Sequence, residues 1–176
     1  MSAAHPAPIP GRWCRATAYE FSDRALRGEL DRTLTSLAKW RSLAEGSAML
    51  TQAVDELWLA VKGGQIGLAR RHALVAAAWA VRVHAELCDR GGDRAQRCAA
   101  SLAAAKAIRA QLTPARVFAS SHEAYGFLRC AMGRFWSAVQ VDDRSEVKDQ
   151  LLIIAAVASR FAAEIHGTSP RSKASA

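Results

Sequence analysis

Hydrophobic residues recur at intervals of three and four along most of this chain. Between residues 50 and 61 the recurring positions are Leu50, Val54, Leu57, Trp58 and Val61. Between residues 127 and 139 they are Phe127, Leu128, Met132, Phe135, Trp136 and Val139. Positions three or four residues apart share one face of an α-helix, so each stretch predicts a helix with one apolar side.

Capping and turn residues predict where these two helices begin and end. Ser42-Leu-Ala-Glu45 and Ser120-Ser-His-Glu123 both fit the S-x-x-E capping box, in which the hydroxyl and the carboxylate accept hydrogen bonds from free amides at a helix start. Turn residues gather at Gly63-Gly64 and at Val141-Asp142-Asp143. Each helix is therefore expected to run from its capping box to its turn.

Four further helices are predicted around this pair. Two of them, around residues 68–87 and 145–165, are apolar over most of their circumference near residues 73–81 and 151–157. Helices of that kind belong in the middle of a bundle. The other two, Phe21–Arg41 and Asp93–Leu112, each precede one of the capped helices.

The two halves of the chain align without a gap when the sequence is shifted by 78 residues. The coincident pairs include Leu50/Leu128, Trp58/Trp136, Arg82/Arg160 and Glu86/Glu164, and the paired Trp and Arg are the most informative. We infer from these matches an internal duplication of a three-helix unit. Because each helical hairpin needs a partner to cover its apolar face, the two units are expected to pack together. The prediction is an all-α bundle of about six helices with pseudo-two-fold symmetry.

This organisation divides the chain into four parts. Residues 21–90 and 91–166 are predicted to form the two repeats. The proline-rich segment 1–20 and the basic tail 167–176 are predicted to be flexible.

Composition and charge narrow the possible partners. The 24 Lys and Arg residues exceed the 16 acidic ones and give a net charge of +8, but the positive charge is spread out and no nucleic-acid-binding signature accompanies it. Nucleic acid is therefore not the expected partner, although the charge leaves it open. No stretch approaches the ~20 apolar residues needed to span a membrane. The four cysteines form no CxxC pair, and we expect a cytoplasmic protein with reduced thiols.

The second repeat resembles the MazG-like group of all-α nucleoside triphosphate pyrophosphohydrolases. Those proteins often combine a helix S-x-H-E-x-Y-x-x-L-x-E-E-x-x-E-L-W with a helix E-L-x-x-x-A-A-x-A-x-R-F. This chain matches the two patterns at Ser120, His122, Glu123, Tyr125, Trp136, Leu151, Ala155, Ala156, Ala158, Arg160 and Phe161. The first repeat contributes VDELWLAVK, residues 54–62, and the resemblance covers about half of the chain.

The resemblance implies metal-dependent chemistry that these residues no longer match. In the family, carboxylates of E-E-x-x-E and E-x-x-D hold Mg²⁺, which activates the attacking water. The corresponding positions of the first repeat are Gln52, Ala53, Glu56, His72 and Val75. Those of the second repeat are Cys130, Ala131, Arg134, Gln150 and Ile153. Only Glu56 keeps a carboxylate, and Arg134 would bring a positive charge to a cation site.

We therefore expect a catalytically degenerate protein without a cofactor, acting as a structural or protein-interaction module with a protein partner or a second copy of itself. Two alternatives stay open. The chain could hold a nucleotide without cleaving it, with Arg70, Arg71 and His72 as phosphate contacts. It could also retain weak Mg²⁺-dependent hydrolysis through Asp55 and Glu56.

Three other groups of residues have both a chemical and a structural interpretation. His84, Cys88 and Cys98 could form part of a zinc site, but buried thiols explain them more simply. His122 and Glu123 could act as a base pair, yet the capping box already explains the glutamate. The tryptophans could stack on a nucleobase, and at helical positions we expect core packing instead. They are Trp40, Trp58, Trp79 and Trp136.

Overall fold

The computed structural model describes residues 15–88, 92–112 and 117–166, which contain six α-helices and one π-helical turn. In chain order these are α1 (Arg15–Ser36), α2 (Leu43–Lys62), α3 (Ile66–Val83), the π-turn η1 (His84–Cys88), α4 (Arg94–Leu112), α5 (Ser121–Gln140) and α6 (Arg144–Glu164). The predicted all-α bundle of about six helices is confirmed. None of the described helices combines the length and the apolar character that crossing a membrane requires.

Helix α1 differs from the prediction at both ends. It begins at Arg15, inside the segment 1–20 that was predicted to be flexible, and it ends at Ser36 rather than Arg41. Near its start, the Tyr19 hydroxyl donates a hydrogen bond to the carboxylate of Glu164. After its end, the carbonyl oxygens of Leu37 and Ala38 accept hydrogen bonds from Arg82. Tertiary contacts of this kind have no local sequence pattern, which explains the misplaced boundaries.

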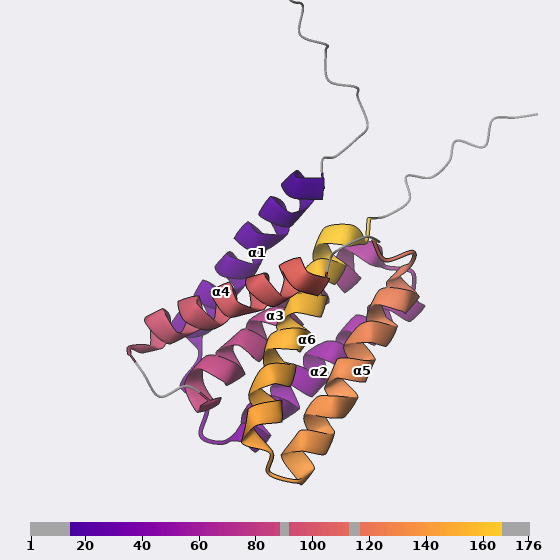
Figure 1. Ribbon diagram of the computed structural model, residues 1–176. Helices are drawn as coiled ribbons and strands as arrows, with labels where there is room; N and C mark the ends of the chain where they lie inside the picture. The colour runs from indigo at the N-terminus through magenta and orange to yellow at the C-terminus, as the bar shows by residue number, and fades with distance from the viewer. Residues whose placement is uncertain (1–14, 89–91, 113–116, 167–176) are drawn as a thin grey trace, which may run out of the picture.

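The helices form three layers (Figure 1). Helices α3 and α6 pack against each other in the middle, and their alanine-rich segments are almost completely buried. Helix α2 covers α3 and α5 covers α6 on one side, while α1 and α4 lie on the other. The prediction that the two apolar helices occupy the centre of the bundle is confirmed.

The shift of 78 residues relates structure as well as sequence. Helix α2 maps onto the full extent of α5, and α3 begins at the residue equivalent to the start of α6. Ser42 and Ser120 cap α2 and α5, and each hydroxyl accepts a hydrogen bond from the amide of the glutamate three residues later, at 3.2 Å and 3.1 Å. The side chains of Glu45 and Glu123 in turn accept from the amides of Arg41 and Ala119. Both predicted capping boxes are therefore formed, with the return bond one residue further out than usual.

The turns after α2 and α5 also repeat in detail. The amides of Gln65 and Asp143 donate to the carbonyl oxygens of Ala60 and Ala138, both at 2.9 Å. Gly64 and its equivalent Asp142 both adopt the left-handed backbone conformation, with φ of 64° and 52°. The same turn is thus built once on a glycine and once on an aspartate, which tolerates this conformation better than most residues.

Replacing Gly64 with Ala is expected to lower the free energy of unfolding by about 1 kcal/mol, because an L-residue is strained at positive φ. A methyl group there would meet no atom within 4 Å, so the cost comes from the backbone alone. Urea unfolding measures it. The matched control is Gly63→Ala, where φ is −78°. Equal effects of the two substitutions would contradict the strain argument.

Helices α1 and α4 are joined by a cluster of opposite charges. The Asp23 carboxylate accepts hydrogen bonds from both terminal nitrogens of Arg109, at 2.6 Å and 3.1 Å, and pairs with Lys106 at 3.1 Å. Burial opposes ionisation of Asp23, but the two basic side chains outweigh it and hold the pKa of this carboxyl below its ordinary value. The cluster fixes the first helix of one half to the first helix of the other.

Candidate functional site

In the first half, three of the positions singled out by the family resemblance come together between α2 and α3. Gln52 Nε2 donates to Glu56 Oε1 at 3.0 Å, and His72 Nδ1 lies 3.2 Å from Glu56 Oε2. Ala53 is buried beneath them, while Asp55 is exposed. The predicted juxtaposition of Gln52, Glu56 and His72 is therefore present, with both oxygens of the carboxylate already engaged.

These residues do not suit a magnesium ion. Mg²⁺ prefers an octahedral shell of oxygen atoms, usually with one or two carboxylates among them. Here Glu56 is the single carboxylate, its partners present nitrogen atoms, and Val75 stands where a further acid would be needed. Across the described ranges, no three His, Cys, Asp or Glu side chains are grouped so that they could hold a metal ion.

In the second half, two of the five equivalent positions line a depression of about 670 Å³ between α5 and α6. Cys130 and Arg134 line it, together with Asp143 and Glu146. Gln150 is buried, and its Nε2 donates to Glu146 Oε1 at 2.8 Å. Ala131 is buried and Ile153 half-buried, and both are apolar. An exposed guanidinium group thus occupies the side of this helix pair on which the resembled enzymes would present carboxylates.

The predicted phosphate contacts are mostly engaged elsewhere. Arg70 Nε donates to the carbonyl oxygen of Ala162 at 2.8 Å, which ties α3 to the end of α6. His72 faces Glu56. Arg71 is exposed. Arg70, Arg71 and His72 therefore do not converge on one ligand position.

The structure favours the simpler interpretation of the other candidates. Trp40 and Trp79 are buried, with ring centroids 5.4 Å apart, and Trp58 stacks on Tyr125 at 4.6 Å. Glu123 caps α5, as described above, while His122 is exposed and meets the Trp58 ring edge-on.

The residues considered as zinc ligands do not form a zinc site among the described residues. His84 Nδ1 lies 2.8 Å from Ser101 Oγ. Burial, reinforced by the charge of Glu86, raises the pKa of the Cys98 thiol to about 11, so the thiolate that zinc requires is disfavoured. The side chain of Cys88 lies outside the described part of the structure.

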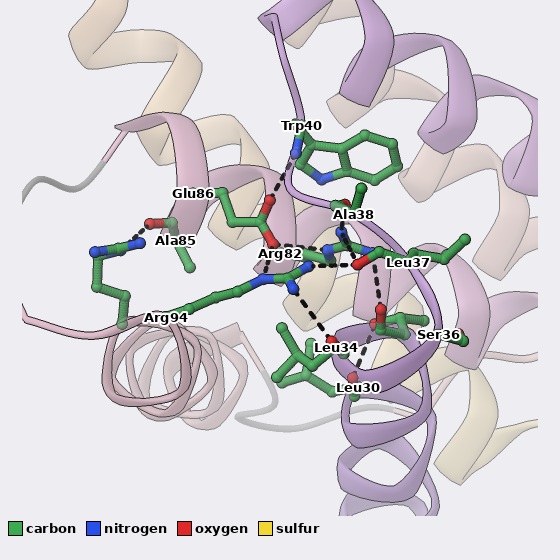
Figure 2. Close-up of polar contacts among 12 residues, drawn as sticks. Leu30, Leu34, Ser36, Leu37, Ala38, Trp40, Arg82, Ala85, Glu86 and Arg94 are labelled. Carbon is green, nitrogen blue, oxygen red and sulfur yellow. Dashed lines mark hydrogen bonds and ion pairs between the residues drawn. The ribbon is translucent and has the colours of Figure 1, made fainter.

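Figure 2 shows a buried polar group to which the sequence patterns assigned no role. We call it the first clasp: the Glu86 carboxylate with three donors. Arg82 Nε and Arg94 Nε donate to Glu86 Oε1 at 2.8 Å and 2.6 Å, and the Trp40 amide donates to Oε2 at 2.9 Å. The side chains of Arg82 and Glu86 are 0% exposed. The guanidinium of Arg82 also lies over the Trp40 ring, 4.6 Å from its centroid.

The remaining N–H groups of the two arginines donate to backbone carbonyl oxygens at the end of α1 and just after it. Arg82 donates to the carbonyl oxygens of Thr33, Leu37 and Ala38, and Arg94 to those of Leu34 and Leu37. The carbonyl groups of Leu34, Leu37 and Ala38 lie at the end of α1 or just past it, where an α-helix leaves its last carbonyl groups without internal donors, whereas that of Thr33 also accepts from the Leu37 amide at 3.2 Å. The first clasp therefore replaces a helix cap and holds the connection between α1 and α2 against α3.

A second clasp occupies the equivalent place in the other half. Arg160 Nε donates to Glu164 Oε1 at 2.6 Å, and the Phe118 amide donates to Oε2 at 2.8 Å. The Arg160 guanidinium lies 4.2 Å from the centroid of the Phe118 ring, as Arg82 does over Trp40. The third donor is the Tyr19 hydroxyl. The repeated Arg-x-x-x-Glu spacing was a sequence signal for both clasps, and it was visible among the coincident pairs.

Each clasp takes one donor from the opposite half of the chain. Arg94 belongs to the second half and binds Glu86 of the first. Tyr19 belongs to the first half and binds Glu164 of the second. The duplicated scaffold is thus retained in both halves, whereas the carboxylates expected at the metal positions are not.

No protein-family model, curated protein or solved structure matches this chain.

Proposed function

We propose that this protein is a non-catalytic helical module, built from two degenerate copies of a MazG-like unit, that serves a structural or protein-binding role. The proposal rests on a contrast between the positions that hold the fold together, which are the same in both halves, and the positions assigned to metal ligands, which have lost all but one of their carboxylates. The residues that stabilise the fold, Arg82 with Glu86 and Arg160 with Glu164, are present in both halves with the same geometry. Of the ten positions that the resemblance assigns to metal ligands, Glu56 alone is a carboxylate.

The electrostatics at these positions also oppose metal-dependent hydrolysis. In one half the Glu56 carboxylate is bound by Gln52 and His72. In the other half Arg134 brings a positive charge to the same side of the helix pair. The two nearby carboxylates are already used, since Asp143 caps α6 and Glu146 accepts from Gln150, and the guanidinium would repel a cation placed beside them.

The surface offers a feature suited to a protein partner. The Phe127 ring is more than half exposed, and its centroid lies 5.6 Å from that of Phe118. Val117, next to Phe118 in the chain, is also exposed. Exposed aromatic and aliphatic side chains near one another favour a surface that a partner or a second copy covers.

Hydrolysis assays test the non-catalytic role directly. With Mg²⁺ and a panel of ribonucleoside and deoxyribonucleoside triphosphates, we expect no pyrophosphate release above the background without protein. The Glu56→Gln variant is expected to behave like the unmodified chain, and so is the control Asp149→Asn, which removes an exposed carboxylate elsewhere on α6. Release that is lost in Glu56→Gln and kept in Asp149→Asn would refute the proposal.

A thermal-shift experiment separates the proposal from simple nucleotide binding. A ligand that binds the folded state raises its melting temperature. We expect no shift with nucleotides, with or without Mg²⁺. A shift that occurs without Mg²⁺ and disappears in Arg71→Met would favour the nucleotide-holding alternative instead.

A further inference from the structure

A cavity of about 230 Å³ lies away from the positions discussed above, where the starts of α2 and α6 meet the end of α5 and the π-turn η1. It is lined by Leu43, Leu87, Val139, Asp142, Arg144, Val147 and Lys148. Four of these residues are apolar, and the three charged ones are exposed. The cavity therefore combines an apolar lining with charged groups in contact with solvent.

The duplication supplies an internal comparison for this cavity. Val139 is half-buried, whereas its equivalent Val61 is 1% exposed. Leu87 is half-buried, whereas its equivalent Ile165 is buried. The apolar surface that is covered at one of the two equivalent positions is thus partly open at the other.

The basic residues of the two halves explain part of this difference. Arg70 donates to the carbonyl oxygen of Ala162 and so spans the closed position. Its equivalent, Lys148, is exposed and has no hydrogen-bond or ion-pair partner among the described residues. Arg144 adds a second cation, and its equivalent at the closed position is the apolar residue Ile66. An ammonium group without a described partner, beside a cavity that is apolar on one part of its lining, is the arrangement that a ligand with an anionic head and an apolar body needs.

The π-turn is a second asymmetry at the same place. After α3, residues His84–Cys88 form a π-helical turn, whereas α6 continues as an α-helix to Glu164. Leu87 belongs to this turn and lines the cavity. Single π-turns within α-helices occur frequently at functional sites.

We propose that this cavity binds a small aliphatic carboxylate, with its chain against Leu43, Leu87, Val139 and Val147 and its head at Lys148 and Arg144. Asp142 pairs with Arg144 at 3.3 Å, which leaves the Lys148 charge available for the ligand. An apolar cavity of about 150 Å³ accommodates benzene, so this volume suits a ligand of about ten non-hydrogen atoms. The site is separate from the residues on which the proposed function depends.

The groove between α1 and α4 is the competing location. It has a volume of about 280 Å³, and Arg27, Asp31 and Lys106 are among the residues that line it. Lys106 is already paired with Asp23 at 3.1 Å, and Asp31 adds a negative charge that would repel a carboxylate. Each site thus holds two basic residues and one acidic residue, and the partly open apolar surface and the π-turn favour the cavity beside Lys148.

Octanoate is the probe that tests the assignment. In a titration followed by ¹⁵N–¹H correlation spectra, we expect saturable shifts of the amides around Leu87, Val139 and Lys148. The expected dissociation constant is about 1 mM, the weak affinity usual for a ligand of about ten non-hydrogen atoms. Acetate lacks the chain and octanol lacks the charge, so both are expected to bind at least about tenfold more weakly.

Variants then locate the site. Lys148→Met keeps the aliphatic stem and removes the charge, and we expect about tenfold weaker binding of octanoate. Val139→Phe fills the cavity and should abolish the saturable shifts, with a dispersed spectrum showing that the variant is folded. Arg27→Met, in the competing groove, should bind like the unmodified protein. No saturable shifts with octanoate, equal binding of octanol, or loss in Arg27→Met without loss in Lys148→Met would each overturn the proposal.

Discussion

Replacing Glu86 with Gln is expected to lower the free energy of unfolding by about 3–5 kcal/mol, the usual cost of removing one partner of a buried ion pair. The glutamine keeps one oxygen that can accept from the Trp40 amide, but its NH2 group then faces the Nε donors of Arg82 and Arg94, so the change removes both the charge and their shared acceptor. Arg82 would then be left 0% exposed without its counter-charge. Since folded domains are stabilised by only about 5–15 kcal/mol, this one substitution takes a large share of the total.

Urea unfolding, followed by circular dichroism, measures this effect, with Glu164→Gln as the matched variant in the other half. The second substitution is expected to cost less. Arg160 is 12% exposed, so water solvates its charge in part, and the third donor to Glu164 is the neutral Tyr19 hydroxyl. A loss below about 1 kcal/mol for Glu86→Gln would mean that the first clasp contributes no more than a surface ion pair.

The pH dependence of the free energy of unfolding, measured for the unmodified chain and for Glu86→Gln, gives an independent check. Burial opposes ionisation of Glu86, but hydrogen bonds from Arg82, Trp40 and Arg94 outweigh it and hold its pKa below the ordinary value of 4.5. A lowered pKa stabilises the folded state above the unfolded pKa, and this contribution is lost as the pH falls through the folded value. The difference in stability between the unmodified chain and Glu86→Gln should therefore be full above about pH 5 and shrink progressively below pH 4.5.

Replacing Phe135 with Ala is also expected to cost about 3–5 kcal/mol, through lost burial and the cavity left behind. Phe135 is 0% exposed on the inner face of α5, and its ring contacts Trp136 edge-on at a centroid distance of 5.7 Å. The equivalent residue in the first half is Leu57, which is equally buried. The two halves therefore fill the same position with side chains of different size.

The Phe135→Leu variant makes the second half resemble the first and is the control for this prediction. It retains most of the buried volume, so we expect it to cost less than half as much as Phe135→Ala. Leu57→Ala is expected to cost about 2–5 kcal/mol. Denaturant midpoints at constant slope measure all three changes. If Phe135→Ala cost no more than Phe135→Leu, the bundle would have closed around the vacated space.

The elements that the sequence predicted well are those set by local chemistry. The capped starts of α2 and α5 and the turns at Gly64 and Asp142 depend on residues a few positions apart, and all four lie where the patterns put them. The central position of α3 and α6 followed from their alanine-rich, apolar circumference. The duplication was visible because equivalent residues recur at one unchanged separation.

The features that the sequence left unassigned depend on contacts between distant segments. Arg82 and Arg160 were recognised as a coincident pair, but their carbonyl partners lie 44 or more residues away along the chain. The hydrogen bond from Arg70 to the carbonyl oxygen of Ala162, 92 residues away, likewise has no local sequence pattern. At the candidate site, helical spacing places Gln52 and Glu56 on one face of α2, whereas His72 on α3 was added by the family resemblance and not by any local pattern. The π-turn at His84–Cys88 was not predicted.

The exchange of donors between the clasps determines what counts as a complete folding unit. Glu86 needs Arg94, and Glu164 needs Tyr19, so neither three-helix half contains every group that its own buried carboxylate requires. A chain carrying a single copy would have to obtain the missing donor from a second molecule, and its stability would depend on protein concentration. With both copies in one chain the donor is always supplied at the high effective concentration of an intramolecular contact. The duplication thus makes assembly of the bundle independent of encounter between molecules.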